Sequence, residues 1–394
     1  MSLKSLDFIP SPDNQYKAID IFSHELCHAL ARQGVKSHFY ETDRDNPKAF
    51  LEQIFSHPPD CTMSFNGLLP DDQGRFLCDL IKIPHIAFVT HTPHEFFPLL
   101  KSQNTIIACS DQDFCKTLLS SNFPYVLFLP LAVPRDLRPP LDPVYDVLML
   151  NSFIDYMEIH NHWRKAYPAD LVTVLEAAAE QVLKERDISY IQAFVETFDQ
   201  LLKKRRFVDP LKLNYTEILG SLESYVSGKS RLELLKSINS GQVHVFGTGW
   251  QTKEAKKHFE SHSYPIRFHE PIPFMQAIEL MRRAKIVLNT TPAIKRGLHE
   301  RVLAGLASGA AVLALETPFL KETFQDEEDI LFFSPRNWDE VNQKIRFYLE
   351  KDNRRTKLAA NGRKKILQDH TWDQRAITLV QQLPPLLDKI KTRN

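Results

Sequence analysis

Ala284-Lys-Ile-Val-Leu-Asn-Thr-Thr-Pro292 contains a short apolar run, Ile286 to Leu288, and a second one, Ala311-Val-Leu-Ala-Leu315, follows about twenty residues later. Both runs have the length and composition of buried β-strands. Between them lie a polar loop and a segment rich in small residues, Leu298 to Gly309, which is typical of a helix packed closely on a sheet. The pattern predicts a strand, loop, helix, strand unit with parallel strands and a right-handed crossover.

The loop of this unit is predicted to lie at the carboxyl end of its first strand, where open α/β sheets bind ligands. A helix that begins near Leu298 would direct backbone N–H groups and a partial positive charge into the loop, beside Arg296 and Arg301. An anion is therefore the expected ligand. The alternative is structural: Gly297 makes only a turn, and the small residues only allow close packing.

Further motifs accompany this unit in a fixed order. They are Gly297-Leu-His-Glu-Arg-Val302, Leu306-Ala-Ser-Gly309, Glu316-Thr-Pro318, Phe324-Gln-Asp-Glu-Glu-Asp-Ile-Leu-Phe-Phe333, Trp338-Asp-Glu340, Ala359-Ala-Asn-Gly-Arg363 and His370-Thr-Trp372. Together they resemble the C-terminal region of the group 1 glycosyltransferases, and most closely the spore-coat maturation (CgeB-like) subfamily.

This resemblance implies a GT-B fold, in which two Rossmann-like doubly wound domains face a cleft and the second domain binds the sugar donor. It also implies a metal-independent, hexosyltransferase-like enzyme whose co-substrate is a nucleotide-diphosphate sugar, with a UDP-sugar expected and no further cofactor. The implied diphosphate-binding residues are Arg296, Gly297, Leu298, His299 and Arg301. Glu300 is expected to hold the ribose hydroxyls.

Two positions depart from the wider group. Retaining relatives carry Glu-Gly-Phe-Gly at the loop and a second Glu eight residues after the first. Aligned on Gly297 and Gly309, those positions hold Arg296 and Ala304 here. A catalytically silent nucleotide-sugar or glycan-binding module is therefore an alternative to the active enzyme.

A second glycine-containing turn, Gly247-Thr-Gly249-Trp250, follows a predicted strand and resembles the Gly-x-Gly-Trp turn of the family. Such a turn lets backbone approach a nucleotide closely, although a simple tight turn explains the glycines equally well. His269 begins the segment that corresponds to the base-binding loop. Gly247, Gly249, Trp250 and His269 are accordingly predicted to bind the nucleotide sugar.

The catalytic base is expected in the first half of the chain. Asp13 follows the first predicted strand, and His91 follows a later one in Val89-Thr-His-Thr-Pro93. An inverting displacement needs a general base that deprotonates the acceptor hydroxyl, and either residue suits that role. A purely structural role remains open for each.

The predicted architecture is α/β with two domains. Residues 1–135 alternate strands with helices, among them a strand over Val35 to Glu41 and a helix over Asp71 to Lys82, and form an acceptor domain. Pro130 to Pro143 contains five prolines and reads as a linker. Residues 141–371 form the nucleotide-sugar domain, with strands over Tyr145 to Leu150 and Val243 to Phe246 that a helical insertion at 156–238 separates. The last segment, 372–394, is expected to be a helix that returns to the first domain.

Composition excludes several classes of partner. Lys plus Arg (49) equals Asp plus Glu (49), so no net field attracts the chain to nucleic acid or an anionic membrane. No apolar run is long enough to cross a bilayer, and the N-terminus has no signal-peptide core. We expect a cytoplasmic protein with reduced cysteines, acting on a glycan or protein acceptor.

His24-Glu-Leu-Cys-His28 matches the His-Glu-x-x-His pattern of zinc peptidases. On a helical wheel Ile19, Phe22, Leu26, Ala29 and Leu30 form the buried stripe, which leaves both histidines on the opposite side. No third ligand has a motif to support it. We therefore expect no metal site, and a zinc metallopeptidase is the remote alternative.

Overall fold

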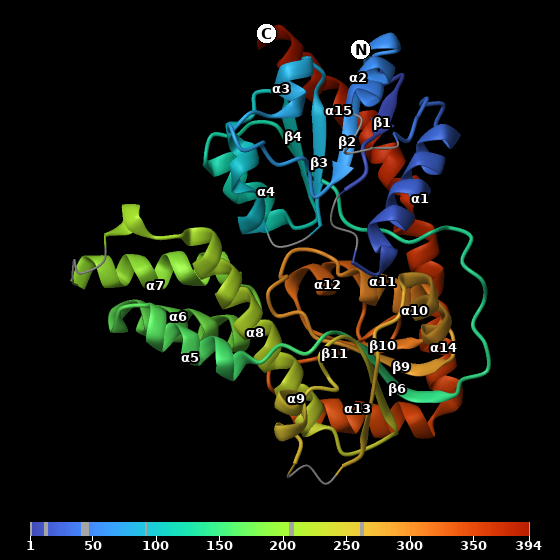
Figure 1. Ribbon diagram of the computed structural model, residues 1–394. Helices are drawn as coiled ribbons and strands as arrows, with labels where there is room; N and C mark the ends of the chain where they lie inside the picture. Colours follow the sequence, from blue (N-terminus) through green and yellow to red (C-terminus); the bar gives the residue numbers. More distant parts are fainter. Residues whose placement is uncertain are drawn as a thin grey trace. The chain divides into compact units, whose positions relative to one another are not determined.

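The computed structural model describes residues 2–11, 15–40, 47–90, 93–204, 209–260 and 264–393. The chain divides into two compact units. Unit 1 comprises residues 1–136 and 367–394, and unit 2 comprises residues 137–366. Each unit is built around its own parallel sheet (Figure 1), in agreement with the predicted α/β class.

Unit 1 contains a five-stranded sheet in which each strand pairs with the next one along the chain. Its strands are β1 (Leu6–Phe8), β2 (Cys61–Phe65), β3 (His85–Val89), β4 (Thr105–Cys109) and β5 (Val126–Phe128). Its helices are η1 (Gln15–Lys17), α1 (Ala18–Arg32), α2 (Pro47–Ser56), α3 (Leu77–Ile81), η2 (Pro93–Lys101), α4 (Gln112–Ser120) and α15 (Trp372–Arg393).

Two elements of unit 1 differ from the prediction. Of the strand predicted over 35–41, the described residues 35–40 make only isolated bridges, from Lys36 to Ser5 and from Phe39 to Phe8. They run along the edge of β1 opposite to β2, so the chain changes direction across the sheet between β1 and β2. The helix predicted over 71–82 is shorter, because the carboxylate of Asp71 accepts hydrogen bonds from the backbone N–H groups of Gln73 and Arg75 and makes a turn instead.

The terminal helix α15 belongs to unit 1 and completes its core. Trp372 is 1% exposed. Its ring lies 5.3 Å from that of Phe22 in α1, and 6.0 Å and 6.4 Å from those of Phe65 and Phe88 in the sheet. At the surface Arg32 forms a bidentate ion pair with Asp373.

His85 is a neutral histidine in the middle of the unit 1 sheet. It is 1% exposed, and its ring nitrogens each lie 2.8 Å from a hydroxyl, that of Thr62 on one side and that of Ser64 on the other. Desolvation lowers the pKa of His85 to about 3. Because the unfolded chain binds a proton there that the native chain does not, stability is lost as pH falls below the unfolded pKa, which is about 6.5.

We expect the free energy of unfolding to decrease between pH 6.5 and pH 5 with a His85 contribution approaching about 1.4 kcal/mol per pH unit. His85→Gln cannot be protonated, so its urea midpoint should depend less on pH over this range. Parallel pH profiles for the two proteins would contradict the prediction.

Unit 2 contains a six-stranded parallel sheet in the order β11-β10-β9-β6-β7-β8. Its strands are β6 (Tyr145–Leu150), β7 (Val243–Phe246), β8 (Ile266–His269), β9 (Ala284–Asn289), β10 (Ala311–Leu315) and β11 (Leu331–Phe333). The helices that connect and cover them are α9 (Lys253–Lys257), α10 (Phe274–Met281), α11 (Glu300–Ala307), α12 (Pro318–Thr323), α13 (Trp338–Glu350) and α14 (Asp352–Asp369).

The two faces of this sheet are covered by different helices. Ile286 and Leu313 share a buried cluster with Val341 and Ile345 of α13. On the opposite face α11 approaches so closely that a Cβ at Gly305 would lie 2.8 Å from the side chain of Val312. The small residues of the predicted crossover helix thus permit close helix-sheet packing, and Figure 1 shows α11 and α13 on either side of the strands.

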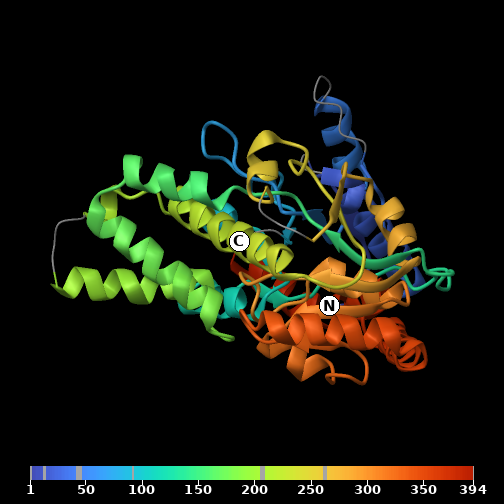
Figure 2. The ribbon, with the colours of Figure 1, turned by 90° about the horizontal axis from the view of Figure 1, so that it is seen from below.

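The predicted helical insertion is confirmed between β6 and β7. It consists of α5 (Tyr156–Ala166), α6 (Ala169–Lys184), α7 (Tyr190–Lys204), η3 (Pro210–Lys212) and α8 (Tyr215–Ser237). These helices form one group in both views (Figures 1 and 2). Within the described ranges no helix of the chain is long and apolar enough to cross a bilayer.

Candidate functional site

The unit 2 sheet changes direction between β6 and β9. From β6 the chain continues to β7 and β8 on one side, whereas β9, β10 and β11 lie on the other. Loops that leave the carboxyl ends of β6 and β9 therefore diverge, and open α/β sheets bind ligands at such a switch point. The strand-loop-helix-strand unit predicted from the sequence, β9-α11-β10, borders this switch point on one side.

Residues of α8 reach the switch point from the insertion. The hydroxyl of Ser230 lies 2.6 Å from that of Thr290, which directly follows β9. Arg231 donates from Nη1 to the carbonyl oxygen of Ser152, just after β6, at 3.0 Å. The end of the insertion thus joins the two loops that border the site.

Helix α11 begins at Glu300, two residues later than predicted. His299 is its N-cap, and the imidazole Nδ1 lies 3.2 Å from the backbone nitrogen of Arg301 and 2.9 Å from the Glu300 carboxylate. The imidazole therefore accepts from one of the first backbone N–H groups of the helix, and this N–H is not available to a ligand.

Two guanidinium groups face this point with unused donors. Arg231 Nε is buried and has no hydrogen-bond partner among the described residues. Desolvation and the nearby charge of Arg301 lower the pKa of Arg231 to about 10. The closest charge contact found for the guanidinium of Arg301 within the described ranges is the Glu300 carboxylate, at 3.7 Å from Nε. A bound anion would relieve the repulsion between the two arginines.

Glu300 and His299 complete the cluster. Desolvation favours the neutral carboxyl, but the interaction with the His299 imidazole and the charge of Arg301 outweigh it and hold the pKa of Glu300 below its usual range. Burial lowers the pKa of His299, and the neighbouring Glu300 carboxylate partly opposes that shift. The side chain of Glu300 is 26% exposed and keeps acceptor capacity for a ligand hydroxyl.

The three other predicted residues of the loop lie differently. Arg296 forms an ion pair with Glu322 of α12. Leu298 is 2% exposed, so its side chain contributes to the core. Gly297 is buried backbone just before the cap. The structure therefore brings His299, Glu300 and Arg301 to the cluster with Arg231, whereas the Arg296 side chain contacts α12.

The Gly247–Trp250 turn borders the same site from β7. A Cβ at Gly247 would lie 1.8 Å from the carbonyl oxygen of Asn151, and Gly249 has φ +82. Trp250 is 1% exposed and donates from Nε1 to the Asn151 carbonyl at 2.7 Å, so its side chain supports the turn from the core and cannot stack on a base. Asn151 Oδ1 is buried, again without a partner in the part of the chain that the structure describes.

His269 ends β8 at the edge of the sheet. Its ring stacks on that of Phe246 at 4.2 Å, and its Nε2 lies 2.9 Å from Nδ1 of His244. Desolvation lowers the pKa of both histidines. His269 thus belongs to a stack of rings at the β7-β8 edge, two strands away from β6.

Asp13 and His91, the predicted bases, lie outside the described residues. The prediction for α1 is confirmed: its buried face carries Ile19, Phe22, Leu26, Ala29 and Leu30. His24 and His28 are exposed. His24 stacks on Phe39 at 4.7 Å, and the described residues contain no group of three metal-ligating side chains.

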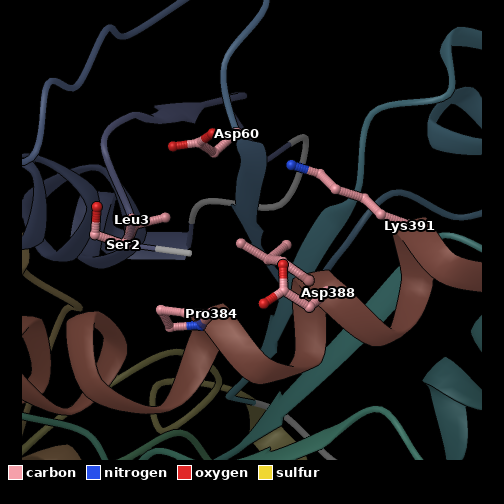
Figure 3. Close-up of a pocket in the computed structure, with 7 residues that line it drawn as sticks. Ser2, Leu3, Asp60, Pro384, Asp388 and Lys391 are labelled. Atoms are coloured by element: carbon pink, nitrogen blue, oxygen red, sulfur yellow. The ribbon is translucent and has the colours of Figure 1, made fainter.

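A pocket in unit 1 lies between the N-terminal segment and α15 (Figure 3). Ser2, Leu3, Asp60, Pro384, Leu387, Asp388 and Lys391 line it. Its empty volume of about 210 Å³, open solvent included, is smaller than the sites that bind ligands of nucleotide size. It is not a candidate for the donor site.

Comparison with known proteins decides the fold. Residues 230–381 match the family model described as glycosyl transferase-like. No curated protein matches the sequence significantly. Sucrose-phosphate synthase from Thermosynechococcus elongatus is similar at 11% identity with a TM-score of 0.55, over 99% of this chain and 100% of that chain. Anabaena HepE in complex with UDP-glucose is similar at 10% identity with a TM-score of 0.55, over 98% and 99% of the two chains.

The chain has the GT-B fold of glycosyltransferases. A glycosyltransferase from Rickettsia africae is similar as well, with 11% identity, a TM-score of 0.50 and 100% of each chain covered. The predicted GT-B class is thereby confirmed, and the family match spans α11 and the end of α8.

Arg231 is the residue of this GT-B chain that the sequence did not single out. It lies in a long helix among many other charged residues, where a solvated position is the normal interpretation. One signal was available: Gly228, Ser230 and Ser227 make a run of small residues around it, which is typical of close packing. A Cβ at Gly228 would lie 2.6 Å from the Ile154 carbonyl oxygen, next to the loop after β6.

Proposed function

We propose that the protein transfers a sugar from a nucleotide-diphosphate donor to a glycan or protein acceptor. The observation that carries the proposal is the pair Arg231 and Arg301, which interact electrostatically at the switch point and have spare donors. A diphosphate is the anion that such a pair fits, and both the GT-B fold and the family match support this choice.

The two arginines would act on the leaving group. Negative charge develops on the diphosphate as the bond to the sugar breaks, and fixed cations stabilise it without a metal ion. Glu300 would accept hydrogen bonds from the ribose hydroxyls, and Asp13 or His91 would deprotonate the acceptor in an inverting displacement. The Gly247–Trp250 turn and His269 would approach the nucleoside.

A UDP-sugar is the donor to test first, because Anabaena HepE, with the same fold, was solved in complex with UDP-glucose. We also propose that the enzyme is hexosyltransferase-like, belongs with the CgeB-like subfamily and acts in the cytoplasm. The motifs around α11 support the subfamily assignment.

The test is a thermal-shift screen of UDP, GDP, ADP and TDP with their sugars. Ligand at a hundredfold excess over its Kd adds about 2.7 kcal/mol to the free energy of unfolding, so binding raises the midpoint visibly. We expect UDP to act, and Arg301→Ala to weaken its binding by about tenfold.

The matched control for this substitution is Arg354→Ala. Arg354 is an exposed arginine of α14 that lies over the Phe347 ring, and its loss should leave the UDP shift unchanged. If no nucleotide raises the midpoint, the proposed function is wrong.

A second candidate is a silent nucleotide-sugar-binding module. It is favoured by the two aligned carboxylate positions: Arg296 is paired with Glu322, and Ala304 is 0% exposed in the core. UDP binding without donor hydrolysis or transfer would select it over the enzyme.

A further inference from the structure

Lys295 is a buried lysine in the loop between β9 and α11. It is 1% exposed. Its ammonium donates to the carbonyl oxygens of Val182 at 3.0 Å and Glu185 at 2.7 Å, which belong to the last turn and the C-cap of α6. The C-terminal end of a helix has free carbonyls and a partial negative charge. A cation there donates hydrogen bonds to the carbonyls and interacts favourably with the helix dipole.

The same loop is fixed on its other side by backbone. The carbonyl oxygen of Lys295 accepts from the backbone nitrogen of Phe319 in α12 at 3.3 Å. Lys295 lies four residues before His299 and six before Arg301. The loop that leads into α11 is thus held at Lys295 by both α6 and α12.

Other residues of the insertion reach the neighbouring loops at the carboxyl end of the sheet. Arg186 donates to Glu316 after β10 at 2.9 Å and to Ser334 after β11 at 3.1 Å. Arg336 after β11 forms ion pairs with Glu180 of α6 and Glu233 of α8. The insertion thus contacts the loops that follow β6, β9, β10 and β11.

We infer that Lys295 is a positioning residue that tethers the β9-α11 loop to α6, and that the helical insertion is the support of the proposed donor site. This inference rests on the proposed function only for the identity of the ligand, a nucleotide-diphosphate sugar. Lys295 itself does not need to touch that ligand, because it acts through the loop.

The cost of burying the Lys295 ammonium agrees with a role in holding the loop. Desolvation lowers the pKa of Lys295 to about 8, against the opposing charges of Asp187 and Glu185. An apolar side chain of the same length would avoid this desolvation. It would also leave the Val182 and Glu185 carbonyls without their donor, so the loop would lose its attachment to α6.

The experiment compares Lys295→Met with Lys344→Met in the full chain. Lys344 is 12% exposed and donates to the Phe332 carbonyl at 2.7 Å and to Asp326 at 2.8 Å, on α13 and away from the loop. Hydrogen exchange of residues 290–299 and the affinity for UDP are measured for both. In Lys295→Met we expect faster exchange in the loop and affinity lower by at least about tenfold. In Lys344→Met we expect a lower unfolding midpoint with neither change.

The two readouts separate the inference from the proposed function. Faster loop exchange in Lys295→Met, with no UDP binding by the unaltered chain, overturns the proposed function and supports the tether. Unchanged exchange overturns the tether, and faster exchange with wild-type UDP affinity overturns the positioning role. Should Lys295→Met fail to fold, Lys295→Gln replaces the ammonium with a shorter, neutral amide donor, and we expect faster loop exchange and weaker UDP binding than in the unaltered chain. Unchanged exchange in Lys295→Gln then overturns the tether.

Discussion

Replacing Arg231 with methionine is expected to reduce kcat/KM for the sugar donor by about a hundredfold or more. The guanidinium carries one of the two positive charges at the switch point, and its Nε has no partner among the described residues. Methionine keeps much of the apolar volume, so the loss is mainly one of charge and hydrogen bonding. Steady-state kinetics with a UDP-sugar, or UDP affinity by calorimetry, measure the effect.

Arg355→Met is the matched control. Arg355 is 5% exposed in the same unit and donates to the Tyr348 carbonyl, remote from the carboxyl end of the sheet. Its loss should lower stability and leave the donor kinetics within about twofold, since a remote site couples weakly. Equal kinetic effects of the two substitutions would mean that Arg231 is only structural.

Gly247→Ala is expected to produce the largest loss of stability, about 3 kcal/mol or more. The added Cβ would lie 1.8 Å from the carbonyl oxygen and 2.4 Å from the carbonyl carbon of Asn151. Both are backbone atoms, so the turn after β7 must move away from the loop after β6. The site between the two loops should then lose its nucleotide affinity.

Urea unfolding followed by far-UV circular dichroism suits this measurement, because it reports the unfolding of both units and Gly247 and the control residue lie in different ones. The control is Gly74→Ala. Gly74 has φ +76 and no atom within 4 Å of an added Cβ, so only backbone strain of about 1–2 kcal/mol is expected. A Gly247→Ala midpoint as high as that of Gly74→Ala would contradict the clash.

The sequence predicts this fold well where a strand is buried on both faces. The apolar runs at 145–150, 243–246 and 311–315 are strands with the predicted bounds, because buried parallel strands have no polar face to obscure them. The strand Leu331–Phe333 was not predicted. It is only three residues long and directly follows an acidic turn, so no extended apolar run marks it in the sequence. The 35–41 segment has the composition of a strand, but its described part, residues 35–40, pairs only at two isolated bridges.

The candidate site is predictable only in part. His299, Glu300 and Arg301 follow from the family motif and their place after a strand. The start of α11 shifts by two residues because a histidine, which is not a usual cap, caps it. Arg231 lies in α8 and Lys295 in the loop before α11, and each meets its partners only in the tertiary structure, so no local pattern shows those partners.

The discontinuity of unit 1 has a consequence for synthesis. Residues 137–366 are contiguous and can bury their core as soon as they leave the ribosome, whereas the unit that contains the N-terminus needs Trp372 from the last helix. Until the α15 segment has been translated, the aromatic side chains of Phe22, Phe65 and Phe88 lack the indole that packs against them. Unit 1 therefore completes its core only after the whole of residues 137–366 has been made.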